Sequence, residues 1–264
     1  MSSRTSTRPV LSAATSSDRV RAIAVAATAV AQVVSAAVGG AVTGAISDAN
    51  NSPVTPAGYA FSIWGLIYLA SLALAVYQLR PSQLGRDIHR RTGWWLVAAF
   101  TASTVWIPVF GLRLLGLSQV IIVGLLVALA IATSRMAMQP ASSRGEQAFL
   151  RLPTALYLGW ATLATMAGFG LVLRSWGMSA DSTTTTAVSL VLIVVATLGC
   201  VLVVLRFTAL AAFAFTAGWA LVAVVVASYV PVVRVAAVVG LLVVVATLIV
   251  RTGRSPRKAQ LLLG

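Results

Sequence analysis

Eight long apolar runs constrain this chain most, because each is about as long as a helix that crosses a lipid bilayer. A hydrocarbon core of about 30 Å needs about 20 helical residues. The runs cover residues 22–46, 57–79, 92–112, 117–138, 149–173, 184–205, 208–229 and 231–250. They are continuously apolar, without the two-residue alternation of a membrane β-barrel. We therefore expect an all-α, polytopic integral membrane helical bundle of about eight transmembrane helices. Short turns near Arg206 and Pro231 leave a seven-span division as the alternative.

The charges fall mainly on one side of these runs. Residues of the hydrophobic types make up 59% of the chain and charged residues 9%, so a soluble domain is excluded. If the eight runs alternate in direction, 16 of the 19 basic residues lie on the side of both termini. This split follows the positive-inside rule, so both termini are expected in the cytoplasm. The net charge of +14 is thus topological, and no nucleic-acid partner is expected. Arginine outnumbers lysine 18 to 1, which favours a GC-rich bacterium and its cell membrane.

The chain changes character near residue 180. Six of the seven tryptophans lie in or beside the first five runs, whereas the last three are almost entirely Val, Leu and Ala. We expect a disordered, cytoplasmic N-terminal tail (1–20), because it is rich in Ser, Thr and Arg. A five-helix ligand-binding unit (21–175), a three-helix membrane extension (176–250) and a basic cytoplasmic tail (251–264) follow.

Residues that carry catalytic chemistry are scarce. Every Arg, Asp and Glu lies at or beyond an expected span end, and neither paired carboxylates, a metal-ligand cluster nor a nucleophile with a base is visible. Cys200 is the single cysteine and is expected to pack inside a span. His89 is the single histidine and is expected in a solvated arginine-rich loop. We therefore expect that the protein is not an enzyme and that it has no catalytic residue, no metal site and no cofactor.

Aromatic side chains are the remaining candidates for a site. Phe61, Trp64 and Tyr68 share one face of the second run at spacings i, i+3 and i+7. In the fifth run, two aromatic rings and two small residues form one stripe: Tyr157, Trp160, Ala164 and Gly168. Rings beside small residues suit a slot for a flat apolar ligand. With Trp106 of the third run, they would form a pocket that opens outward, under the polar segment 47–56. Ordinary helix packing is the alternative for the deeper tryptophans, and Trp94, Trp95 and Trp176 suit interface anchors.

Three segments resemble the TspO/MBR family of tryptophan-rich sensory or translocator proteins. "TPAGYAFSIWGLIYL" (55–69) is similar to the signature that opens the family's second helix. "ASTVWIPVF" (102–110) resembles its third-helix segment and "YLGWATLAT" (157–165) its fifth. The order and intervals agree over roughly residues 20–175. Ser103 and Gly168 stand where the family often has Asn, and one proline of a pair is present.

The resemblance implies a five-helix bundle with a cavity near the outer side, closed by the loop between the first two helices. It implies binding of tetrapyrroles such as protoporphyrin IX, or of sterol-like ligands, and often a homodimer. The last three spans resemble the extension of longer bacterial relatives. The expected partners are a hydrophobic small molecule and the lipid bilayer. The candidate ligand-binding residues are Pro56, Tyr59, Phe61, Trp64, Tyr68, Ser103, Trp106, Tyr157, Trp160, Ala164 and Gly168.

The expected function is non-enzymatic binding of a flat hydrophobic ligand, with a sensory or regulatory role. Stacking on the tryptophans would supply affinity, and tyrosine hydroxyls would orient the ligand. One alternative is a facilitator or exporter of a small apolar metabolite, since a facilitator needs no intramembrane charge. A second is a tetrapyrrole-degrading activity supported by radical transfer through the tryptophans.

Overall fold

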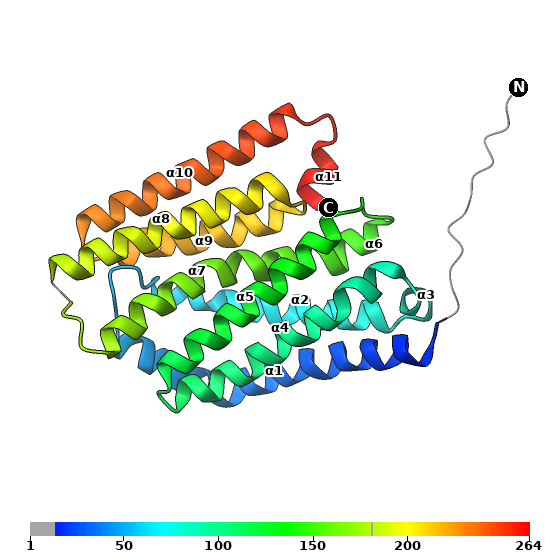
Figure 1. Cartoon of the computed structure of the whole chain (residues 1–264), viewed down its shortest axis with the longest axis horizontal. Coiled ribbons are helices and arrows are strands. Elements are labelled where there is room, and N and C mark those ends of the chain that lie inside the picture. Colours follow the sequence, from blue (N-terminus) through cyan, green and yellow to red (C-terminus); the bar gives the residue numbers. More distant parts are fainter. Residues whose placement is uncertain (1–13, 181) are drawn as a thin grey trace, which may run out of the picture.

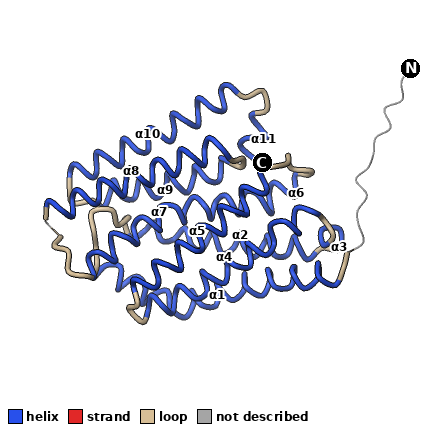
Figure 2. The backbone as a smooth tube through the Cα atoms, in the orientation of Figure 1, coloured by secondary structure: helices blue, strands red, loops and turns tan. Residues whose placement is uncertain are grey.

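The computed structural model describes residues 14–180 and 182–264, and within these ranges it is helical without strands (Figures 1 and 2). The first helices along the chain are α1 (Ser16–Ala49), η1 (Gly58–Ser62), α2 (Ile63–Leu79), α3 (Pro81–Leu84), α4 (Asp87–Gly111) and α5 (Leu115–Ala137). They are followed by α6 (Arg144–Glu146), η2 (Gln147–Arg151), α7 (Leu152–Ser175), α8 (Thr183–Arg206), α9 (Leu210–Ala227), α10 (Pro231–Arg254) and α11 (Lys258–Leu263). In this described part, eight helical segments are long and apolar enough to cross a membrane, which confirms the eight-span prediction over the seven-span alternative. The chain is an integral, multi-pass membrane protein.

The spans pack in an order that differs from their order along the chain. α1 packs on α4, α4 on α5, and α5 on α7, while α2 lies between α1 and α7. α7 also packs on α9, and α10 lies against both α8 and α9 (Figure 1). The buried apolar side chains of α7 and α9 belong to one continuous core, which also includes residues of α2, α4, α5 and α8. Two of the last three spans, α8 and α9, are therefore packed directly onto the helix that carries Tyr157 and Trp160.

Close contact between α7 and α9 depends on Gly159. A Cβ atom at this position would meet the Thr216 hydroxyl and the Phe213 carbonyl closer than real Cβ contacts allow. The Thr216 hydroxyl donates to the Leu156 carbonyl over 2.9 Å. A small residue and an interhelical hydrogen bond are typical of membrane helix interfaces, where apolar burial alone does not favour one helix over lipid.

The first helix begins at Ser16, so the expectation of disorder through residue 20 is wrong for its last five residues. Thr15 and Asp18 form a reciprocal capping box at this end. Asp18 also pairs with Arg21 at 2.6 Å and with Arg90 at 2.7 Å, which fastens α1 to α4. Residues 1–13 of the expected tail lie outside the described part of the chain.

His89 is buried, so the expectation of a solvated loop residue is wrong. α4 begins at Asp87, five residues before the expected span, and His89 shares its buried face with Leu96 and Phe100. The imidazole is 1% exposed and lies edge-on to Tyr77, with 5.9 Å between ring centroids. The apolar run in the sequence starts only at residue 92, because His89 and its arginine neighbours lower the hydropathy of the first helical turn. The opposite face of that turn, which carries His89, is nevertheless buried.

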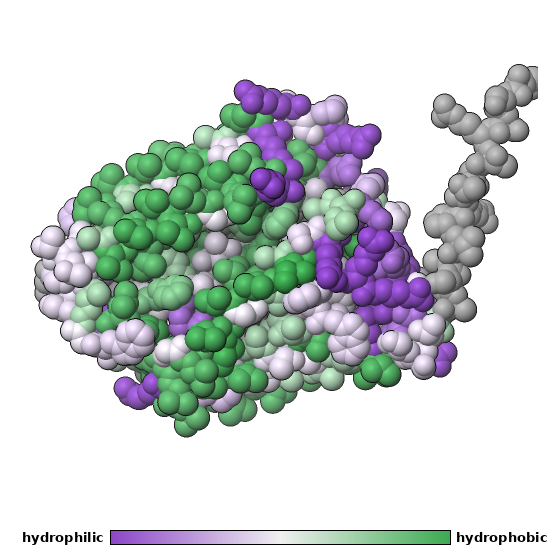
Figure 3. All heavy atoms as spheres, in the orientation of Figure 1, coloured by the Kyte–Doolittle hydropathy of each residue, from purple (hydrophilic) through white to green (hydrophobic). Residues whose placement is uncertain are grey.

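Charged residues are concentrated at one end of the bundle. Figure 3 shows hydrophilic residues gathered at the end where α1 begins in Figure 1, next to a largely apolar flank. Glu146 lies in this end and pairs with Arg151 at 2.7 Å and Arg86 at 2.8 Å. The turn between α1 and α2 lies at the opposite end (Figure 1). We call these the basic end and the distal end.

Candidate functional site

A cavity of about 460 Å³ lies in the distal half of the bundle. This volume falls within the roughly 300–1,000 Å³ typical of small-molecule sites. It is walled by α1, α2, α4, α5, α7 and α9, and by the segment between α1 and α2. The lining residues are Ala36, Gly40, Thr43, Gly44, Ser47, Asp48, Val54, Thr55, Pro56, Gly58, Phe61, Trp64, Tyr68, Trp106, Ile107, Phe110, Ile122, Trp160, Leu163, Ala164, Ala167, Gly168, Leu171, Ala220 and Val224.

The α1 wall is made of small residues on one helix face. Gly40, Thr43, Gly44 and Ser47 recur at three- and four-residue intervals and line the cavity. A Cβ atom built at Gly40 or Gly44 has no neighbour within 4 Å, so open space adjoins both positions. This wall was not identified from the sequence, although the Gly/Thr/Ser periodicity near the end of the first apolar run was a readable signal.

The segment 50–57 covers the cavity and is fastened at several points. The Ser52 N–H donates to the Thr55 hydroxyl at 2.9 Å, and the Thr55 N–H donates to the Ser52 carbonyl at 2.9 Å. The Arg174 guanidinium donates to the Asn51 carbonyl over 3.1 Å. Val54 and Thr55 are buried and line the cavity. The cover is an ordered turn rather than a loose loop.

Trp64 is the centre of an aromatic cluster on one side of the cavity. Its ring stacks on Tyr68 at a centroid distance of 5.5 Å and on Trp106 at 6.3 Å. It meets Tyr157 edge-on at 5.8 Å and Trp160 edge-on at 6.0 Å. Three spans, α2, α4 and α7, thus contribute rings in contact with one indole. Offset-stacked and edge-to-face pairs are favourable aromatic geometries, so the cluster holds these rings in fixed positions.

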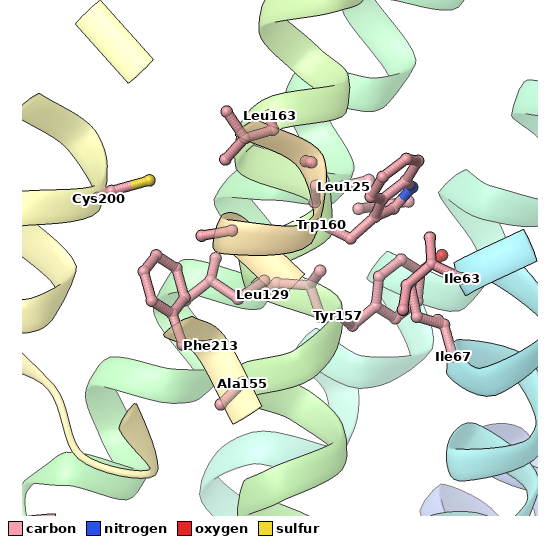
Figure 4. Packing of buried hydrophobic residues seen from close by; sticks show 14 of the residues in the cluster. Ile63, Ile67, Leu125, Leu129, Ala155, Tyr157, Trp160, Leu163, Cys200 and Phe213 are labelled. Carbon is pink, nitrogen blue, oxygen red and sulfur yellow. The ribbon is translucent and has the colours of Figure 1, made fainter. Parts of the chain in front are cut away.

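Trp160 and Tyr157 point from α7 toward α2, as Figure 4 shows, whereas Phe213 lies on the opposite side of α7. Trp160 is 1% exposed and lines the cavity. Among the described residues, none accepts a hydrogen bond from its indole N–H. A buried N–H without a partner costs free energy, and an acceptor on a bound molecule would remove that cost.

A small polar network lies behind the aromatic cluster. Ser103 is buried in α4, next to the hydroxyls of Tyr68 and Tyr157. The Tyr157 hydroxyl also donates to the Gln32 side-chain oxygen on α1, over 3.4 Å. These groups join α1, α2, α4 and α7 around the rings. They position Tyr68, whose ring lines the cavity, rather than forming the wall themselves.

The ninth helix, α9, closes the side of the cavity that the first five spans leave open. Ala220 and Val224 of α9 line it. The Ala57 N–H donates to the Ala223 carbonyl at 3.1 Å, and the Trp219 indole N–H donates to the Ala60 carbonyl at 3.1 Å. α9 thereby holds the turn that leads into α2. Sequence reasoning missed these residues because the run is nearly uniform in Val, Leu and Ala; Trp219, its single tryptophan, was the available signal.

Gly168 is opposite a buried glutamine. A Cβ atom at Gly168 would collide with the side-chain oxygen of Gln119 from α5. The Gln119 amide donates to the Thr165 carbonyl over 2.9 Å. The absence of a side chain at Gly168 thus admits an amide group from a neighbouring helix, a partner that the sequence did not reveal.

Eight of the eleven candidate residues line the cavity: Pro56, Phe61, Trp64, Tyr68, Trp106, Trp160, Ala164 and Gly168. Three do not. Ser103 and Tyr157 lie behind the wall, and Tyr59 is 46% exposed with its ring edge-on to Trp219 at 5.3 Å. Phe61 lies in η1 rather than in the helix of Trp64, and its ring still meets Trp160 edge-on at 5.9 Å.

Asp48 is the only Asp, Glu, His, Lys or Arg in the cavity lining of the described chain. It is exposed at the end of α1, where the hydroxyls of Thr43 and Ser47 also lie. The rest of the lining is mainly apolar and aromatic, with Thr55 as a buried polar residue. Within the described residues, no group of three or more His, Cys, Asp or Glu side chains is placed to hold a metal ion.

The family model described as TSPO-like protein matches residues 19–250. The chain belongs to this family. The match extends into all eight spans, so α9, which supplies Ala220 and Val224 to the cavity of this TSPO-like protein, falls within the family pattern. No curated protein and no solved structure matches the chain.

Proposed function

We propose that this TSPO-like protein binds a flat hydrophobic molecule in the distal cavity and has no catalytic activity of its own. The observation that carries the proposal is the Trp64 cluster, in which rings from three spans border a cavity of about 460 Å³. Aromatic walls favour planar apolar ligands through burial and stacking. Family membership supports a membrane ligand-binding role, which we extend to sensing or regulation by ligand occupancy.

The chemistry of the lining favours a ligand with an apolar body and one acceptor. The unpartnered Trp160 N–H would donate to an acceptor on the buried part of the ligand. Because the described lining contains no Lys, Arg or His, a carboxylate would lack a cationic partner inside the cavity. A tetrapyrrole such as protoporphyrin would therefore keep its carboxylates at the mouth, near Thr43 and Ser47. A sterol-like molecule would need no such arrangement.

The basic end is proposed to face the cytoplasm of a bacterial cell, with the cavity toward the extracytoplasmic side. The charge bias of the loops supports this orientation. The five-helix unit of residues 21–175 is proposed as the main ligand-binding part, with α9 of the extension completing its wall. Homodimerisation is proposed from the family resemblance alone.

A facilitator that moves an apolar metabolite is the second candidate. Its support is the contact of α9 with both the cover and the cavity wall, because movement of the last three spans would change the shape of the cavity. Alternating access requires such a movement around a fixed site.

Titration of the detergent-purified full chain with protoporphyrin IX tests the first proposal. Saturable quenching of tryptophan fluorescence in the micromolar range is expected. The affinity derived from the titration should fall in Trp160→Phe, which removes the N–H. Bleaching of bound porphyrin under light that requires Trp64 and Trp160 would instead indicate degradation. Saturable, ligand-dependent flux across vesicles would favour the facilitator. Absence of saturable quenching with protoporphyrin IX and its dimethyl ester, together with absence of saturable binding of a radiolabelled sterol, would contradict the binding proposal.

A further inference from the structure

A second hollow lies at the basic end of the molecule, far along the chain from the cavity walls of α1 and α2. It is a groove of about 660 Å³ between the ends of α8 and α10, adjoining α11. In Figure 1 these ends lie beside α11, near the C-terminus. The groove is lined by Leu205, Ala246, Thr247, Val250, Arg251, Arg254, Ser255 and Leu261.

The groove changes from apolar to basic along one helix face. Ala246, Val250 and Arg254 recur every four residues on α10 and so follow one another along the groove. Leu205 and Val250 line the groove and are about half exposed, at 52% and 49%, so their apolar surface is open to a bound molecule. The groove therefore presents an apolar track that leads to a guanidinium group. This arrangement is complementary to an amphiphile with a negatively charged head.

The positive charge in this groove has no counterion among residues 14–180 and 182–264. The Arg251 guanidinium donates to the carbonyls of Val204 and Phe207, which are neutral acceptors. No described residue forms an ion pair or hydrogen bond with the Arg254 guanidinium. Residues 182–264 contain six Lys or Arg residues and no Asp or Glu. The groove lining itself contains no carboxylate, so Arg254 is open to an anion from outside the chain.

We infer that the groove binds one anionic phospholipid. The headgroup phosphate contacts Arg254, with Arg251 close behind it, and one acyl chain lies along Leu205, Ala246 and Val250. Basic pockets between transmembrane helices are suited to acidic lipid headgroups, and guanidinium groups bind phosphate through charge-assisted hydrogen bonds. A soluble phosphate would leave the apolar track unused. A zwitterionic lipid would bring an ammonium group to a region without a carboxylate side chain.

Native mass spectrometry of the full chain in detergent micelles tests this inference. The protein is mixed with dioleoylphosphatidylglycerol or with dioleoylphosphatidylcholine, and the bound lipids are counted. We expect one phosphatidylglycerol to be retained in preference to phosphatidylcholine. Arg254→Gln should lower its affinity about fivefold, as expected when one basic residue is removed from contact with anionic lipid. Ala246→Phe, which blocks the apolar track, should also lower it.

Arg257→Gln is the matched control, because it removes the same charge three residues away and outside the groove lining. Its affinity for phosphatidylglycerol should stay within about twofold of the wild type, since only the diffuse field of the basic end changes. Equal retention of the two lipids would overturn the inference. So would an equal loss in Arg254→Gln and Arg257→Gln, or displacement of the lipid by millimolar inorganic phosphate with no effect of Ala246→Phe.

Discussion

Replacement of Trp64 by alanine tests whether the aromatic cluster binds ligand. The expected loss of affinity follows from the area that the ring would offer to the ligand. An aromatic side chain buries roughly 150–250 Å², so one face offered to a ligand contributes about 100 Å². At about 25 cal/mol per Å² this area is worth about 2.5 kcal/mol. The affinity for a planar ligand should therefore fall about 60-fold, at roughly 1.4 kcal/mol per factor of ten. Relaxation of neighbouring rings into the space would reduce this loss.

The assay is a titration of the purified chain with protoporphyrin IX, followed through porphyrin fluorescence so that loss of an indole does not remove the signal. Trp94→Ala is the matched control, because Trp94 is 51% exposed on α4 and lies outside the cavity lining. Thermal unfolding is measured for both variants. Trp64 contacts four rings, and each pair is worth about 0.5–1.5 kcal/mol, so Trp64→Ala should also unfold at a lower temperature.

Binding is compared at a temperature where each variant is folded and monodisperse, which separates the two effects. The reasoning is refuted if folded Trp64→Ala and Trp160→Ala both bind within about twofold of the wild type, a difference below 0.5 kcal/mol. An equal loss in Trp94→Ala would also refute it, because that ring does not adjoin the cavity.

The remaining predictions probe the other walls. Gly44→Leu should reduce ligand affinity at least about tenfold with little change in thermal stability, because its side chain enters open cavity space; Gly65→Leu, also without a close neighbour but outside the lining, is the control, and equal binding by both variants would argue against the cavity. Asp48→Asn should tighten protoporphyrin IX binding about two- to fivefold by removing a carboxylate at the mouth, and should leave the dimethyl ester unchanged; an equal gain for both ligands in calorimetric titrations would point to a cause other than charge. Gly159→Leu should destabilise the fold by about 1–3 kcal/mol, because it forces α7 away from α9; in thermal unfolding Gly124→Leu, where no atom lies within 4 Å of an added Cβ, should stay near the wild type, and similar melting of both variants would show that the α7–α9 contact is not tight.

The clearest success of sequence reasoning concerns elements whose signal is local. Hydropathy over about 20 residues determines a membrane-spanning helix almost alone, because every backbone polar group must be satisfied inside the helix. The helical period likewise brought Trp64 and Tyr68 to one face, and Trp160, Ala164 and Gly168 to another, and all five line the cavity. These residues are related by spacing within one helix, which the order of amino acids specifies directly.

The errors at the basic end arose because hydropathy is computed from neighbours along the chain alone. Hydropathy treats Asp18 and His89 as polar, whatever they contact. Asp18 is 2% exposed because Arg21 and Arg90 pair with it, and His89 is 1% exposed against Tyr77. Pairing with Arg90 of α4 makes burial of Asp18 acceptable, and the Tyr77 ring from α2 covers His89. The apolar runs contain no record of these contacts between helices.

The sequence by itself determined the eight spans, the charge bias between the two ends, and the aromatic faces of α2 and α7. Only the tertiary structure decided that Ala220 and Val224 of α9 complete the cavity, that Gln119 occupies the space beside Gly168, and that Tyr59 turns to Trp219 instead. Between membrane helices, lipid competes equally for apolar surface, so neighbours are chosen by close packing at residues such as Gly159 and by single hydrogen bonds. Those choices depend on the shapes of two surfaces at once, and a periodicity read along one helix contains only half of that information.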